Sequence, residues 1–192
     1  PATVAEIDDL LDAGDGDGLR DRLGSELEFG TAGLRGLIGA GPNRMNRKVV
    51  MRTTAGLCAY LREHAPNALE RGVCIGFDGR RMSREFADDA ARVALGMGFS
   101  VRVFPDVVPT PVLAYACLTT SAAAGIMVTA SHNPPAYNGY KVYWANGAQI
   151  VPPQDAGIAA AIGAVESILA VQTMELDAAR GSGRLTTFGP AL

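Results

Sequence analysis

The segment Thr129–Lys141 (TASHNPPAYNGYK) carries the side chains best suited to chemistry. Ser131, His132 and Asn133 are three polar residues in a row, and a Pro-Pro pair follows them. Proline rigidity holds a hydroxyl in a defined, exposed position without the entropy cost of a long loop. The chain has only two lysines and two histidines, and Lys141 and His132 both lie here. The segment is therefore our first candidate for catalysis.

A serine next to a histidine raises the alternative of a serine hydrolase. Adjacent residues of an extended chain project to opposite sides, so His132 is not expected to reach the hydroxyl of Ser131. The chain also has no G-x-S-x-G motif, and the other histidine, His64, falls at the end of a predicted helix. These observations argue against a hydrolase, whereas a plain polar turn between two strands remains open at this point.

Two further segments combine glycines with groups that bind anions. In residues 29–36 (FGTAGLRG) the glycines let the backbone approach a ligand closely, and the planar guanidinium of Arg35 suits phosphate oxygens. Residues 76–83 (GFDGRRMS) place Asp78 and Arg80 between a predicted strand and a predicted helix, a position that favours anions. An ion pair between Asp78 and Arg80 that braces the loop is the alternative to ligand contact.

The elements that position these segments alternate between helices and short apolar strands. Such alternation indicates a sheet covered on both faces. We therefore predict an α/β fold, a three-layer α/β/α sandwich with a mixed, mostly parallel sheet. Asn46 and Ser83 are predicted to cap the first two of its helices. The predicted strands are 73–77, 101–104 and 125–129, and the predicted helices are 47–64, 84–97 and 109–118.

After Ser131 the pattern becomes hairpin-like. Asn138-Gly139 and Asn146-Gly147 are typical of tight turns. They precede strands that we expect at 140–144 and 149–151, and an Ala/Ile-rich helix is expected over 155–170.

The two ends of the chain differ from its middle. A helix over 3–13 ends in the Gly/Asp run 14–18, which lacks the closing glutamate of an EF-hand and is interpreted as a flexible hinge. The last twenty residues have weak periodicity and are interpreted as a connection. The predicted parts are an N-terminal helical extension (1–24), a main domain with Ser131 (25–170) and a connector toward a second domain (171–192).

Composition narrows the classes of partner. The 192 residues are 48% hydrophobic and 19% charged, which excludes a disordered tail, and a net charge of −3 gives no general attraction to nucleic acid or to an anionic membrane. No stretch reaches the roughly 18 apolar residues that a membrane span requires. Cys58, Cys74 and Cys117 are far apart among apolar neighbours, so we expect buried free thiols and a cytoplasmic protein.

Taken in order, the motifs FGTAGLRG, GFDGRRMS, PTP and GIMVTASHNPPAYNGYKVYW resemble the first domain of the α-D-phosphohexomutases. The likeness is greatest to the branch of phosphoglucomutases and phosphopentomutases, which includes chains labelled phosphomannomutase. It covers roughly residues 20–165 and implies the domain I type of α/β/α fold. It also implies an intramolecular phosphotransferase that moves a phosphoryl group between C1 and C6, or C5, of a sugar phosphate. The route would pass through a phosphoserine and a bisphosphate intermediate.

The resemblance implies a role for each matching residue. Ser131 matches the serine that carries the phosphoryl group, and its phosphate would be one ligand of Mg²⁺. Lys141 matches the lysine beside the phosphoserine, implicated in general acid/base work on the sugar hydroxyl. His132 matches the residue after the serine, which helps to arrange the site and the sugar. A phosphoserine carries about −1.5 to −2 charge near neutral pH, so cations are needed around it.

The other matching residues surround the serine. Arg35 matches the arginine that contacts the phosphoserine, and Thr31 lies in the same phosphate-binding loop. Four residues are interpreted as groups that shape or brace the loops: Asp78, Arg80, Asn133 and Asn138.

The resemblance also implies parts that this chain lacks. The family has four domains, and this sequence contains no D-G-D-x-D-R metal loop. The other Mg²⁺ ligands are therefore expected in a missing domain, and the chain alone is expected to be inactive. The implied partners are sugar phosphates, a sugar 1,6-bisphosphate as activator and the chain's own missing C-terminal domains. The alternative is a stand-alone module that binds phosphorylated ligands or a partner without catalysis.

Overall fold

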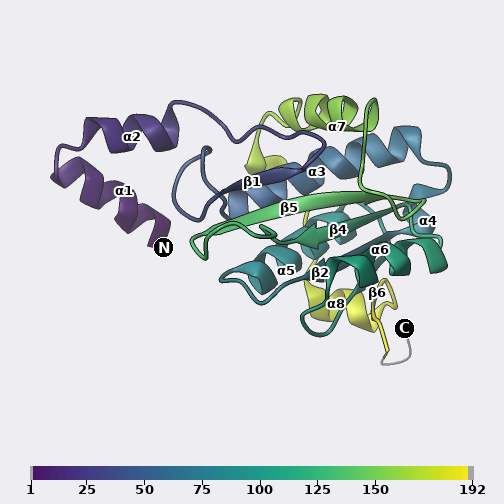
Figure 1. The fold of residues 1–192 in the computed structure, drawn as a ribbon. Coiled ribbons are helices and arrows are strands. Elements are labelled where there is room, and N and C mark those ends of the chain that lie inside the picture. Colours follow the sequence, from purple (N-terminus) through teal and green to yellow (C-terminus); the bar gives the residue numbers. More distant parts are fainter. Residues whose placement is uncertain (1, 190–192) are drawn as a thin grey trace.

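The computed structural model describes residues 2–189 and shows a six-stranded mixed sheet with helices on both faces (Figure 1). Across the sheet the strand order is β1-β5-β4-β2-β3-β6. The strands are β1 (Leu34–Leu37), β2 (Val73–Phe77), β3 (Val101–Val103), β4 (Ala124–Val128), β5 (Tyr137–Trp144) and β6 (Leu185–Thr187). The helices are α1 (Ala2–Asp12), α2 (Gly16–Leu23), α3 (Arg47–His64), α4 (Ala68–Arg71), α5 (Ser83–Gly96), α6 (Thr110–Thr119), α7 (Gln154–Gly163), η1 (Ile168–Ala170) and α8 (Leu176–Gly181).

Strand direction divides the sheet into two parts. β2 pairs in parallel with β3 and β4, and β6 pairs in parallel with β3. β5 runs antiparallel to both β4 and β1. Because Phe77 is the register partner of Val128, the carboxyl ends of β2 and β4 lie side by side. The amino end of β5 begins at the same edge of the sheet, since β5 runs opposite to β4.

Two core clusters confirm the predicted three-layer sandwich. On β2, Val73, Ile75 and Phe77 belong to the larger cluster, to which α3, α5, α7 and α8 contribute. Cys74 belongs to the smaller cluster on the other face, with Leu113 of α6. Every residue of β2 and β4 is buried, which is why both strands are continuous apolar runs instead of alternating ones.

The two predicted helix caps have different outcomes. The side chain of Asn46 accepts a hydrogen bond from the amide of Val49 at 3.1 Å, so its role as the cap of α3 is confirmed. The prediction for Ser83 is wrong. Met82, at φ 63°, precedes α5, and Ser83 is the first helical residue, with its hydroxyl donating to Asp78 at 2.7 Å.

The two Asn-Gly pairs also differ. Gly147 has φ 74° in the turn that joins β5 to a short return segment, in which Ile150 bonds to Val142, so this turn is confirmed. Asn138 and Gly139, expected in a turn, lie instead inside β5. A Cβ atom at Gly139 would lie 2.7 Å from the backbone oxygen of Leu34 on β1 and 2.7 Å from that of Thr129, the residue after β4. The glycine therefore serves close strand contact, and its turn signal is misleading.

The C-terminal segment is more structured than expected. The helix predicted over 155–170 ends at Gly163, and the remainder of that range contains the short 3₁₀ helix η1. Residues 171–189, interpreted as a connection, contain α8 and β6, whose Leu176 and Leu185 are buried in the larger core cluster. Because β6 completes the sheet beside β3, this segment packs as part of the domain.

The N-terminal extension consists of two helices. The prediction of a flexible hinge at 14–18 is wrong, because α2 begins at Gly16 and the carboxylate of Asp15 accepts from the amide of Gly18 at 2.8 Å. Glu6 ties α1 to the domain, since its carboxylate accepts from the amide of Ala40 at 2.8 Å and from Arg22 at 2.7 Å.

The predictions for the cysteines are confirmed. Cys58, Cys74 and Cys117 are all buried and free. Burial raises the pKa of Cys58 to about 12, which leaves its thiol protonated at neutral pH. Among residues 2–189, no helix combines the length and the apolar character needed to cross a membrane.

Candidate active site

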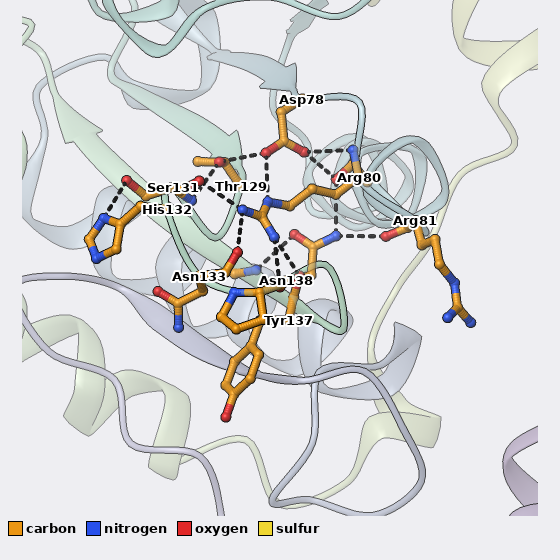
Figure 2. A network of polar contacts seen from close by, with 12 residues as sticks. Asp78, Arg80, Arg81, Thr129, Ser131, His132, Asn133, Tyr137 and Asn138 are labelled. Carbon is orange, nitrogen blue, oxygen red and sulfur yellow. Dashed lines mark hydrogen bonds and ion pairs between the residues drawn. The ribbon is translucent and has the colours of Figure 1, made fainter.

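The predicted site segments meet at one edge of the sheet. Residues 78–83 follow β2 and residues 129–136 follow β4, and these two strands are neighbours. Figure 2 shows the resulting network of polar contacts. Open α/β sheets bind ligands at the carboxyl ends of their strands, so this edge is the expected place for a site.

Ser131 lies in a tight turn on this edge. The amide of Asn133 donates to the carbonyl of Ala130 at 3.1 Å and closes the turn. Ser131 is exposed and has φ 57°, in the left-handed region that glycine adopts far more easily than serine. A strained, exposed serine held in a turn is the kind of arrangement found at functional sites.

Arg80 holds this turn from the neighbouring loop. Its Nη2 donates to the carbonyls of Ser131 at 2.7 Å and Asn133 at 2.8 Å. Its Nη1 donates to the carbonyls of Pro134 at 3.0 Å and Tyr137 at 3.2 Å. With these acceptors engaged, Arg80 braces the loop and is not free to bind a ligand.

Asp78 orients Arg80 and the start of α5. One carboxylate oxygen accepts from the hydroxyl of Ser83 at 2.7 Å and from the amide of Arg80 at 3.1 Å. The other accepts from the hydroxyl of Thr129 at 2.6 Å and pairs with Arg80 Nε at 3.2 Å. An ionised carboxylate offers about four acceptor sites, and these contacts fill them. Asp78 therefore has no spare oxygen for a metal ion or a substrate proton.

Asn138 is fully buried behind the turn. Its Nδ2 donates to the carbonyl of Arg81 at 2.9 Å and to the hydroxyl of Ser83 at 3.0 Å. Its Oδ1 accepts from the amide of Gly139 at 2.8 Å. The side chain thus joins β5 to the loop after β2. Ser83 is not among the predicted site residues, and its part in the network becomes evident from its contacts with Asp78 and Asn138 in the structure.

Arg35 and Lys141 share one face of the antiparallel part of the sheet. Arg35 on β1 is opposite Gly139 on β5, and Lys141 lies two residues further along β5, so the two side chains point to the same side. Burial and, to a smaller degree, the charge of Arg35 lower the pKa of Lys141. Arg35 also donates to Oδ1 of Asn133 at 3.0 Å, which links this face to the turn of Ser131.

Thr31 lies in the exposed loop before β1. Its carbonyl accepts from the side chain of Gln149 at 2.6 Å, a partner that no sequence signal indicated. At the base of the loop, Gly30 and Gly33 pair through backbone hydrogen bonds of 2.8 and 3.3 Å. Gly33 has φ 75°, and a Cβ there would lie 2.0 Å from the carbonyl oxygen of Tyr140. The base of the loop is therefore fixed on β5, while its tip at Thr31 is open.

Comparison with known proteins adds to this geometry. The profile of the phosphoglucomutase/phosphomannomutase alpha/beta/alpha domain I matches residues 26–168. The chain belongs to this family.

Its relatives are sugar-phosphate enzymes of much greater length. Phosphopentomutase of Mus musculus is 45% identical over 168 residues, which cover 84% of this chain and 27% of that protein. Glucose 1,6-bisphosphate synthase of Homo sapiens is 42% identical over 161 residues, with 81% and 26% covered. The structure of parafusin (phosphoglucomutase) from Paramecium, in its open form, gives a TM-score of 0.66 at 20% identity over 81% of this chain and 29% of that one, which shows the shared fold. The chain thus spans about a quarter of the length of these relatives.

The position of His132 corrects one sequence argument. Nδ1 of His132 lies 3.5 Å from Oγ of Ser131, so the two side chains do approach each other. The expectation that they point apart assumed an extended backbone, whereas the positive φ of Ser131 turns the chain. The approach of the two side chains does not by itself indicate a hydrolase, because the chain belongs to a family of phosphoglucomutases and phosphomannomutases.

The domain offers little to a metal ion. Within the described residues 2–189, no three His, Cys, Asp or Glu side chains gather in a way that could hold one. Asp78, at the edge of the site, already has its acceptor sites filled. Oxygen is the donor that Mg²⁺ prefers, and a phosphate on Ser131 would provide it. The residues present thus fit one ligand of a metal ion and not a complete set.

Proposed function

We propose that this domain supplies the phosphoserine of a sugar-phosphate mutase. The observation that carries the proposal is the exposed turn of Ser131, fixed by Arg80 through four carbonyls and linked to Arg35. The phosphoryl group would pass from Ser131 Oγ to a hydroxyl oxygen of the sugar. The serine O–P bond breaks and its electron pair stays on Ser131 Oγ, while a sugar O–P bond forms. A base takes the proton of the sugar hydroxyl, and the serine oxygen takes up a proton. The bisphosphate formed then returns its other phosphoryl group to Ser131. The net result is a sugar phosphate whose phosphoryl group has moved between C1 and C6 (or C5).

The neighbouring residues take complementary parts in this proposal. Lys141 accepts and returns the hydroxyl proton, a role that its lowered pKa supports because it increases the fraction of neutral amine. Arg35 and Thr31 bind the phosphate of the phosphoserine, and His132 orients the sugar. Asn133 positions Arg35 through the contact described above. Phosphoserine hydrolysis would abort the cycle, so the working site must also exclude water.

A metal ion and a bisphosphate complete the proposal. Mg²⁺ would take the phosphate of Ser131 as its ligand from this domain and offset negative charge during phosphoryl transfer. A sugar 1,6-bisphosphate would act as activator by loading Ser131. The relative named glucose 1,6-bisphosphate synthase supports a bisphosphate at a site of this family.

The rest of the machinery is proposed to lie outside this chain. Because the relatives are about three times as long as this chain, we expect further C-terminal domains, reached through the end of segment 171–192, that supply the other metal ligands and the grip on the substrate. The chain alone is then without mutase activity. Small sugar phosphates are its ligands, and we expect the complete protein in the cytoplasm.

The experiment that tests the proposal replaces the nucleophile in the complete protein. Ser131→Ala should lower turnover of a sugar 1-phosphate by on the order of 10³-fold or more, and intact-mass spectrometry should no longer detect the phosphorylated species. Ser121→Ala is the matched control, since Ser121 is also an exposed serine with positive φ, 53°, and lies away from the site. Wild-type turnover in the Ser131→Ala enzyme would refute the proposal.

An immunoblot separates a longer enzyme from a stand-alone module. A native band far above 20.0 kDa supports the mutase, because only a longer chain holds the missing parts. A single band near 20.0 kDa would favour a module that binds phosphorylated ligands without turnover.

A further inference from the structure

We propose that Thr129 is a positioning residue that holds Ser131 in its reactive conformation through a hydrogen-bond relay from Asp78. The inference deepens the proposed function and rests on it. Thr129 is the first residue after β4, and this residue is buried, with 5% of its surface exposed. Its hydroxyl lies 2.6 Å from the carboxylate of Asp78 and 2.9 Å from the amide nitrogen of Ser131. Figure 2 shows both contacts.

The chemistry of the three groups fixes the direction of the relay. An ionised carboxylate only accepts hydrogen bonds, so the single hydroxyl proton of Thr129 is donated to Asp78. The oxygen of Thr129 is then free to accept, and the amide of Ser131 can only donate to it. The Asp78 carboxylate strengthens the second bond, because a donor hydroxyl becomes a better acceptor in a chain of hydrogen bonds.

The turn needs such support because of the residue that it contains. Ser131 has φ 57°, a conformation for which glycine carries no steric cost. Glycine cannot carry a phosphoryl group, so the nucleophile must be a residue that strains the turn. Arg80 holds the carbonyl of Ser131, and Thr129 holds its amide. The two contacts together fix the peptide groups on both sides of the serine Cα.

The other end of the relay is itself fixed. Asp78 also accepts from the hydroxyl of Ser83 and from the amide of Arg80. Thr129 is β-branched, and the stiffness of its χ1 keeps the hydroxyl between its two partners. The relay therefore connects the start of α5 and the end of β2 to the backbone of the nucleophile.

The test compares two substitutions at this position in the complete enzyme. Thr129→Val keeps the shape and removes the hydroxyl, and we expect kcat to fall roughly 10- to 100-fold with KM changed less than about threefold, since a small misplacement of the nucleophile affects the transition state most. Thr129→Ser restores the hydroxyl and should return kcat to within about threefold of the wild type. A Thr129→Val enzyme with the wild-type kcat, or a Thr129→Ser enzyme as slow as the valine variant, would overturn the proposal.

Thr53→Val is the matched control for loss of a buried threonine hydroxyl. Thr53 is 1% exposed in α3, and among residues 2–189 its hydroxyl bonds only to the carbonyl of Val49, at 2.8 Å. We expect a similar change in stability and the wild-type kcat. An equal fall in kcat in this variant would show that the effect of Thr129→Val is a general loss of stability.

A measurement on the unsubstituted 192-residue chain does not depend on how the variants fold. NMR hydrogen exchange should show the amide of Ser131 protected at least about tenfold relative to the amide of His132, its exposed neighbour in the same turn. Equal exchange at the two amides would overturn the relay. If Ser131→Ala leaves turnover unchanged, the proposed function fails; if Ser131→Ala abolishes turnover while Thr129→Val does not lower kcat, only the relay fails.

Discussion

The loop after β4 and the loop before β1 border the same site but are held in different ways. Residues 129–136 are fixed by charged groups, since Arg80 and Asp78 engage their backbone and the side chain of Thr129. Within the part of the chain that the structure describes, the tip of the loop before β1 is held by one hydrogen bond, from Gln149 to the carbonyl of Thr31. The difference indicates that the turn of Ser131 is held rigidly, whereas the tip of the loop at Thr31 can adapt. Under the proposed function, such a division suits a site that binds both ends of a bisphosphate in turn.

Removal of Arg80, which holds the loop after β4, should have the largest effect, a loss of stability. In Arg80→Met, the partly buried carboxylate of Asp78 loses its cation and four carbonyls lose their donor. We expect the free energy of unfolding, measured by urea denaturation, to fall by about 2–4 kcal/mol.

Arg81→Met is the control for that loss of an arginine. The side chain of Arg81 is exposed and extends away from the Ser131 turn in Figure 2, so this variant should keep the wild-type stability within about 0.5 kcal/mol. Equal stability of the two variants would mean that the loop after β4 is not held more firmly than an ordinary surface loop.

Removal of the charge of Arg35 on β1 should have an intermediate effect, which should be visible in the pH dependence of kcat. Burial first and Arg35 second lower the pKa of Lys141, so Arg35→Gln should raise this pKa while burial keeps it below the ordinary value. If the neutral amine is the base, kcat rises with pH through the pKa of Lys141. The rising limb of the profile in the complete enzyme should therefore move to higher pH in Arg35→Gln and disappear in Lys141→Arg. A limb that stays in place in both variants would assign it to another group.

The smallest effect is expected at the adaptable loop. Gln149→Ala removes one exposed hydrogen bond, which contributes about 0.5–1 kcal/mol, so global stability should change little. Hydrogen exchange of the amides of residues 30–32 should become several-fold faster, and Gln172→Ala, an exposed glutamine elsewhere, should leave it unchanged. Unchanged exchange in Gln149→Ala would show that the tip is held by other contacts.

Local signals in the sequence predicted the parts of the fold that depend on neighbours along the chain. Asn46 caps α3 through a residue three positions away, and β2 and β4 are recognisable as continuous apolar runs. The site segments were found for the same reason, because their residue types and spacing are themselves local.

The errors come from contacts between distant segments. Ser83 resembles a cap in sequence, but its hydroxyl is taken by Asp78 and Asn138. Gly139 has the signature of a turn residue, yet it serves the close packing of β5 between two strands. The expectation that Ser131 and His132 point apart is wrong because Ser131 has a positive φ, in a turn whose carbonyl is bound by Arg80 from another loop. None of these contacts between distant segments produces a recognisable pattern among residues that are close in sequence.

The position of β6 has a consequence for the synthesis of the protein. β3 comes off the ribosome well before β6, and until then one edge of β3 has unpaired backbone groups. Exposed strand edges are sites at which chains associate wrongly. A nascent chain halted before residue 187 would therefore expose unpaired backbone groups along one edge of β3. Release of this domain without aggregation depends on translation continuing through β6.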